Sequence, residues 1–189
     1  CKLKMTFDVF HILITRMILF ILKPLRSMNV LIGQLTHVIA MAIIAIMVTA
    51  LALSAVTRYV SGNGYDWFIE LPPVLVSWLV FPLLGPLLKN AQHIKVDFLP
   101  TIIGDENLHW LNLFSHVIAL LASIVFFKAG FDATLLYFKL GQIMELEIEI
   151  PIWWMYLAFP VGFVILGLFS IELVLTDLKN LMHKKEKIK

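Results

Sequence analysis

The sequence contains little charge and almost no cysteine. Only 15% of its 189 residues are Asp, Glu, Lys or Arg, whereas soluble domains carry about 25%. The single cysteine excludes an internal disulfide and any metal or iron–sulfur centre built from several cysteines. The 15 basic and 13 acidic residues leave a net charge of +2, which excludes the strongly basic surface typical of a nucleic-acid-binding protein. Phosphate-binding loops and common hydrolase motifs are also absent, so the sequence does not predict an enzyme.

Hydrophobic residues make up 60% of the chain and gather in four long runs. A helix that crosses a bilayer needs about 20 apolar residues, and in lipid its backbone must satisfy its own hydrogen bonds. The sequence therefore predicts an all-α integral membrane protein with a four-helix membrane domain over residues 28–178. The predicted transmembrane helices cover about residues 30–56, 71–88, 108–127 and 150–175.

The basic residues predict the orientation of these helices. They cluster before the first span and after the fourth, at Lys2, Lys4, Arg16, Lys23 and Arg26, and at Lys179, Lys184, Lys185, Lys187 and Lys189. Because Lys and Arg accumulate on the cytoplasmic side of membranes, we expect both termini to be cytoplasmic. Residues 179–189 are then a basic cytoplasmic tail, and the loop between spans two and three is cytoplasmic as well.

The first 27 residues have a different pattern. Lys4, Asp8, His11 and Thr15 are spaced by four, three and four residues, which places them on one face of a helix with apolar residues elsewhere around it. This pattern predicts an amphipathic helix lying in the membrane interface over residues 1–27. An alternative is that Met28 is the native start and that residues 1–27 are a non-native extension.

Few ionisable residues lie within the predicted spans. His37 and His116 lie near the cytoplasmic ends of spans one and three, and we interpret them as neutral, hydrogen-bonded side chains rather than a proton relay or metal ligands. Glu172, near the end of span four, is interpreted as interfacial. Lys128 and Asp132 are four residues apart and are predicted to pair on one helix face where span three ends.

Prolines are concentrated in the second span. Pro72 and Pro73 suit the first turn of a helix, where a missing N–H costs little. Pro82 and Pro86 lie inside the span and are expected to kink it, which we interpret as a feature of helix packing. Pro151 likewise suits the start of the fourth helix, where an aromatic belt follows it.

Four short motifs lie in order at the ends of the spans. They are Arg58-Tyr59-Val60 after the first span, Trp67 with Glu70 and Leu71 at the second, His93-Ile94-Lys95-Val96-Asp97 after the second, and Ile150-Pro151-Ile152-Trp153 at the fourth. Together they resemble the small membrane subunit, of the DctQ type, of tripartite ATP-independent periplasmic (TRAP) transporters. Ile69 and Pro73 depart from the family pattern, which commonly has an acidic residue and an arginine there.

The resemblance implies a small subunit of a secondary active, sodium-coupled transporter in the bacterial inner membrane. Such a transporter imports an organic acid, such as a dicarboxylate or sialic acid, that a periplasmic binding protein delivers. A large membrane subunit, bound stably to the small one, moves the substrate by an elevator motion. The small subunit would then be a scaffold without a cofactor, sodium would bind in the large subunit, and membrane lipids, including a bound phospholipid, would be further partners.

The resemblance also implies roles for residues in these motifs and in the two predicted outer loops. The residues expected to pair helices at the outer face are Arg58, Trp67 and Glu70. Those expected to contact lipid or the partner subunit at the inner face are His93, Lys95 and Asp97. The acidic candidates for contact with the binding protein are Asp66, Glu145, Glu147 and Glu149.

A different class of function remains open at this point. Four-helix membrane subunits of redox complexes bind haem through histidines on facing helices, or serve as structural membrane anchors. His37 and His116 are the candidate ligands for that alternative. The sequence contains no pair of catalytic residues that would indicate a lipid-modifying enzyme. It also has no polar stripe along any span, which an autonomous channel would need.

Overall fold

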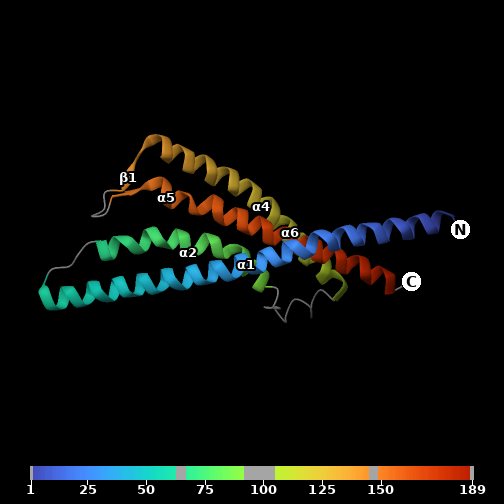
Figure 1. Cartoon of the computed structure of the whole chain (residues 1–189), viewed down its shortest axis with the longest axis horizontal. Helices are drawn as coiled ribbons and strands as arrows, with labels where there is room; N and C mark the ends of the chain where they lie inside the picture. The colour runs from blue at the N-terminus through green and yellow to red at the C-terminus, as the bar shows by residue number, and fades with distance from the viewer. Residues whose placement is uncertain (1, 63–66, 92–104, 145–148, 188–189) are drawn as a thin grey trace.

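The computed structural model describes the backbone of residues 2–62, 67–91, 105–144 and 149–187, and these residues are almost entirely helical (Figure 1). The helices are α1 (Lys2–Ser61), α2 (Trp67–Ala91), α4 (Asp105–Leu140), α5 (Ile152–Tyr156) and α6 (Ala158–Lys187). Two short strands, β1 (Ile143–Met144) and β2 (Ile150–Pro151), pair antiparallel. Among these described residues, four stretches are long and apolar enough to cross a membrane, namely Arg16–Ser61, Trp67–Asn90, Trp110–Leu140 and Ile152–Met182. The predicted four-span, all-α fold is confirmed.

The four long helices form one bundle with α6 in its interior. Helix α6 packs against both α4 and α2, and α1 packs against α2 and α6. The first turns of α1 and the last turns of α6 lie at the same end of the molecule, which we call the terminal end (Figure 1). The β1–β2 hairpin and the end of α1 lie at the opposite end, which we call the hairpin end. This placement agrees with an even number of spans.

The long helices extend beyond the predicted spans, and α1 and α4 extend the furthest. Helix α4 does not end near Phe127 but continues past Lys128 and Asp132 to Leu140, because charged side chains at a membrane surface do not interrupt helical hydrogen bonding. It ends where Gly141 adopts a φ of 61° and its N–H bonds the carbonyl of Tyr137. Such a left-handed glycine is a common helix terminator.

The end of α1 has the same geometry, because Gly62 has a φ of 71° and its N–H bonds the carbonyl of Arg58. At its other end α1 shows no boundary near residue 27, and it continues through Pro24 as one helix of 60 residues. At 1.5 Å per residue it is about 90 Å long, about three times the hydrocarbon thickness of a bilayer. Much of α1 therefore lies outside the hydrocarbon, and the interfacial location of residues 1–27 stays a prediction.

Helices α2 and α6 approach each other closely through glycine. A Cβ at Gly162 of α6 would lie 2.5 Å from backbone atoms of Phe81 in α2. A Cβ at Gly85 of α2 would lie 2.8 Å from the Phe169 ring and 2.9 Å from the Ile165 side chain. Small residues permit this kind of approach in membrane helix pairs. The prolines of α2 do not interrupt its helix, which is continuous from Trp67 to Ala91.

Aromatic side chains connect the helices toward the hairpin end. Pro151 forms the N-cap of α5 with a φ of −63°, so the predicted helix start is confirmed. The indole N–H of Trp78 donates to the Trp154 carbonyl at 3.2 Å, and their ring centroids are 5.3 Å apart. The rings of Tyr137 and Tyr156 stack at 4.3 Å. These contacts join α2 and α4 to the segment that leads into α6.

Candidate functional site

A buried polar cluster joins α1, α2 and α6 toward the terminal end. The Lys89 Nζ lies 2.7 Å from Oε1 of Glu172. The Asn29 Nδ2 donates to Oε2 of the same carboxylate at 2.7 Å, and to the Leu168 carbonyl at 3.2 Å. Asn29 is fully buried and Glu172 is 4% exposed. Both oxygens of the carboxylate therefore have a donor, as a buried charge requires.

The orientation of the Asn29 amide is set by its partners. Because Nδ2 faces two acceptors, a flipped amide would place an oxygen against a carboxylate and a carbonyl. The Asn29 Oδ1 is then the one buried side-chain N or O atom without a hydrogen-bond partner in the part of the chain that the structure describes. An unpaired buried acceptor costs stability. The other contacts of the cluster join one residue from each of three helices, Asn29, Lys89 and Glu172.

A second polar pair joins α4 to α6. The His116 Nδ1 lies 2.6 Å from Oδ2 of Asp177, and both side chains are largely buried. The His37 Nδ1 instead lies 2.6 Å from the carbonyl of Gly33 in its own helix, and this side chain is exposed. His116 thus contacts a neighbouring helix, whereas His37 contacts only the backbone of its own helix.

Neither the Lys89–Glu172 contact nor the His116–Asp177 contact was predicted from the sequence. Glu172, which we interpreted as interfacial, is buried and paired within the chain, and its depth in the membrane stays a prediction. Asp177, which lies beyond the predicted fourth span, is the partner of His116. Both partners are on α6, more than sixty residues away from Lys89 or His116 in the sequence. Sequence spacing gives no signal for contacts over that separation. The presence of a charged residue within an apolar helix indicated only that the residue was unusual, without identifying its partner.

Two ion pairs are found among the residues that the structure describes. These ion pairs are Lys89–Glu172 and His116–Asp177. Arg58 lies in the last turn of α1 and Glu70 in the first turn of α2, and their pairing stays a prediction. Lys128 and Asp132 both lie within α4, but the structure does not pair them.

Most of the other predicted site residues lie outside the described residues. They are Asp66, His93, Lys95, Asp97, Glu145 and Glu147. Glu149 is described, and it is exposed immediately before β2. The proposed roles of these residues in contacts with lipid, the partner subunit or the binding protein therefore stay predictions.

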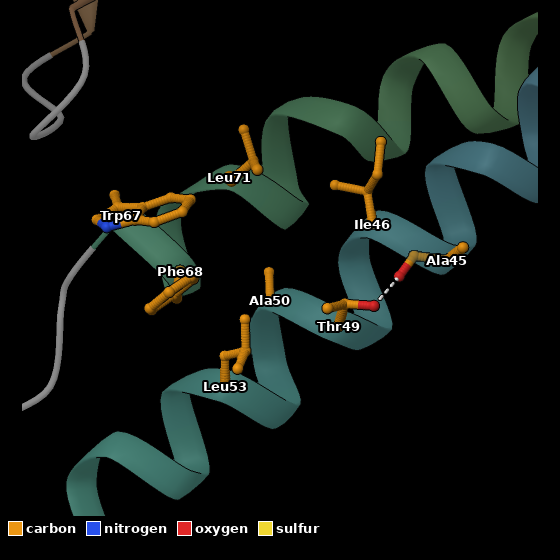
Figure 2. Close-up of a pocket in the computed structure, with 8 residues that line it drawn as sticks. All are labelled: Ala45, Ile46, Thr49, Ala50, Leu53, Trp67, Phe68 and Leu71. Atoms are coloured by element: carbon orange, nitrogen blue, oxygen red, sulfur yellow. Dashed lines mark hydrogen bonds between the residues drawn. The ribbon is translucent and has the colours of Figure 1, made fainter.

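Trp67 lies at an apolar groove between α1 and α2. The groove has a volume of about 330 Å³ and is lined by five residues from α1 and three from α2. Figure 2 shows these residues. Trp67 and Phe68 come from the first turn of α2, and their ring centroids are 3.9 Å apart. Thr49 does not present a free hydroxyl to the groove, because it donates to the Ala45 carbonyl at 2.7 Å. The groove thus offers mainly apolar contacts.

The outer surface of the bundle is strongly apolar. Large hydrophobic side chains are exposed along α1, at Leu31, Leu35 and Val48, and along α4, at Phe114 and Leu121. An aqueous surface does not tolerate continuous apolar faces of this size. Lipid or a partner protein must therefore cover both helices.

The fold and its apolar surface define a multi-pass integral membrane protein. The family model of the DctQ component of tripartite ATP-independent periplasmic transporters matches residues 47–180, and the chain belongs to this family. It is therefore a small membrane subunit of a TRAP transporter, a system that also contains a large membrane subunit and a binding protein, and its family is one of transporter subunits rather than enzymes. Comparisons with curated proteins and with solved structures gave no match.

Proposed function

We propose that this chain is the stationary scaffold of a sodium-coupled TRAP transporter that imports an organic acid, such as a dicarboxylate or sialic acid. The observation that carries the proposal is the family match over residues 47–180. The chain would bind the large membrane subunit stably in the bacterial inner membrane. It would also form part of the surface that receives the periplasmic binding protein.

The internal contacts support a rigid role. Each of the other long helices is tied to α6 by buried polar or close glycine contacts, at Glu172, Asp177 and Gly162. Rigid packing of this kind suits a stationary part, against which a mobile subunit moves. The carboxylates of Glu172 and Asp177 are paired with Lys89 and His116 of this subunit. We therefore assign the sodium and substrate sites to the large subunit.

The exposed apolar faces of α1 and α4 supply the area for lipid and for the large subunit. The hairpin end would face the periplasm, because the terminal end carries the basic residues that favour the cytoplasm. The acidic candidates for docking, Asp66, Glu145, Glu147 and Glu149, would then lie on the side of the binding protein. Acidic side chains there would steer a basic patch of that protein.

Co-purification followed by reconstitution tests this function. The tagged chain is expressed with the large subunit and binding protein encoded beside it, and the detergent-solubilised complex is weighed. The complex is then placed in proteoliposomes, and uptake of labelled organic acids is measured with and without a sodium gradient, in the presence of the binding protein. We expect a stoichiometric large partner, and uptake that needs the sodium gradient and both membrane subunits.

Each part of the proposal has its own contrary result. Full uptake by the large subunit alone would remove the scaffold role. Uptake that persists after the sodium gradient is collapsed would remove sodium coupling while leaving the complex intact. A Soret band in the purified complex would favour the haem-binding alternative.

A further inference from the structure

A second cavity lies at the terminal end, between the first half of α1 and the last turns of α6. Its volume is about 430 Å³, and Lys89 at the end of α2 reaches it. Three further cations line it, Lys23 and Arg26 from α1 and Lys179 from α6. Residues 19–26 of α1 precede the region that the family model matches. Part of the cavity wall thus lies outside the residues that the family model matches.

The cavity has a large excess of positive charge. Its one carboxylate, Glu172, is engaged by Lys89 at 2.7 Å, so these two charges offset each other. Lys23, Arg26 and Lys179 remain, and none of them takes part in an ion pair among the residues that the structure describes. Lys23 and Arg26 are three residues apart and share a helix face. Three cations around one cavity repel one another, and a bound anion would offset that repulsion.

Apolar side chains complete the cavity wall. Leu22 is 9% exposed and Leu173 is 3% exposed, and both line the cavity beside the cations. Lys89 lies at the end of the apolar stretch of α2, and Lys179 lies in the last turn of the apolar stretch of α6. Positions where apolar helices meet basic residues mark the level of the lipid headgroups. The cavity therefore combines a cationic rim with an apolar wall at headgroup depth.

We propose that this cavity binds the headgroup phosphate of an anionic phospholipid. Arg26 contacts the phosphate oxygens through its guanidinium, whose fork of donors matches a phosphate. Lys23 and Lys179 contribute charge from opposite sides of the cavity, and an acyl chain lies along Leu22 and Leu173. Lys89 stays with Glu172 and keeps the carboxylate from repelling the phosphate. The lipid would connect the first half of α1 to α6.

Native mass spectrometry of the full chain, delipidated in detergent, tests the site. The protein is titrated separately with short-chain phosphatidylglycerol, short-chain phosphatidylcholine and glycerol phosphate. We expect phosphatidylglycerol to bind more tightly than phosphatidylcholine, and glycerol phosphate not to bind in the same range. Each cation is expected to contribute about fivefold in affinity. The triple variant Lys23→Gln, Arg26→Gln, Lys179→Gln is then expected to lose on the order of a hundredfold.

A matched variant removes three charges from the basic tail, with Lys184→Gln, Lys185→Gln and Lys187→Gln. It has the same net charge as the cavity variant, so an equal loss of affinity in both would overturn the site. The three cavity positions are exposed or half-exposed, and unchanged melting temperatures will show that the variants fold. The charge-conserving variant Arg26→Lys should keep the preference for the anionic lipid.

Three further results would overturn the proposal. Equal binding of phosphatidylglycerol and phosphatidylcholine would show that the positive charge of the cavity does not contribute to lipid binding. Equal binding of glycerol phosphate would assign the cavity to a soluble phosphate instead of a lipid. Loss of lipid binding when the large subunit is present would identify the cavity as a contact between subunits.

Discussion

Gly162 makes the closest approach between two helices that the glycine geometry reveals. A Cβ there would lie 2.5 Å from the backbone of Phe81, and backbone cannot move aside as a flexible side chain can. We therefore expect Gly162→Ala to destabilise the bundle by about 1–3 kcal/mol, the usual cost of overpacking. The apparent melting temperature, followed by tryptophan fluorescence in detergent, measures the effect.

Gly33→Ala is the matched control for this substitution. A Cβ at Gly33 would lie 3.7 Å from the Phe169 ring, which is ordinary contact. Alanine also favours the helix over glycine by up to about 1 kcal/mol, so we expect an unchanged or higher melting temperature. A melting temperature for Gly162→Ala equal to that for Gly33→Ala would refute the close approach of α2 and α6.

Breaking the Lys89–Glu172 pair should also destabilise the protein. Removing one partner of a fully buried pair costs about 3–5 kcal/mol, but the Lys89 side chain is 28% exposed and water screens part of that cost. We expect Lys89→Met to cost about 1–3 kcal/mol in unfolding free energy, because it leaves the Glu172 charge with Asn29 alone.

A double-mutant cycle isolates this pair. The double variant Lys89→Met, Glu172→Gln should be more stable than the sum of the single variants predicts, by about 0.5–3 kcal/mol. Glu149→Gln, at an exposed position, is the control and should change little. Strict additivity of the two single changes would show that the pair contributes no coupling.

At the scale of elements, the sequence predicted the helices well and their ends poorly. Runs of apolar residues placed all four spans, because hydropathy is a local property that a window of sequence contains. The end of α4 was missed because Lys128 and Asp132 were interpreted as a helix end, whereas the terminator is the left-handed Gly141. Similarly, the charge pattern of residues 1–27 suggested a separate element, but no terminator separates it from the rest of α1.

The hairpin between α4 and α5 is the element proposed to meet the binding protein. Replacing Glu145, Glu147 and Glu149 with Gln should slow transport most at low salt, because long-range steering by charge is screened as salt rises. Reconstituted uptake is measured over a range of salt and of binding-protein concentrations. Glu172 is not a suitable control because it is buried, so a variant with Lys184→Gln and Lys185→Gln in the tail is used instead. An unchanged salt dependence in the hairpin variant would remove this docking role.

At the scale of the whole molecule, the interior is organised around α6. Glu172 and Asp177 lie one to two turns apart on this helix, yet they contact α2 and α4 respectively. The sequence indicated that Glu172 was unusual near the end of an apolar segment, but it could not identify the partners of Glu172 or Asp177. Those partners depend on how three helices pack, which no local pattern contains. This explains why the membrane class and the family were predictable while the polar cluster was not.

The orientation of the whole molecule in the membrane gives the last prediction. Since the terminal end carries most basic residues, it should be cytoplasmic and the hairpin end periplasmic. Cys1→Ser removes the one cysteine, and in that background Gln142→Cys and Lys184→Cys each provide a single thiol. In intact cells a membrane-impermeant maleimide should label Gln142→Cys, which is exposed beside β1, and should label Lys184→Cys only after the cells are opened. The reverse pattern would place the acidic hairpin in the cytoplasm, away from any periplasmic binding protein.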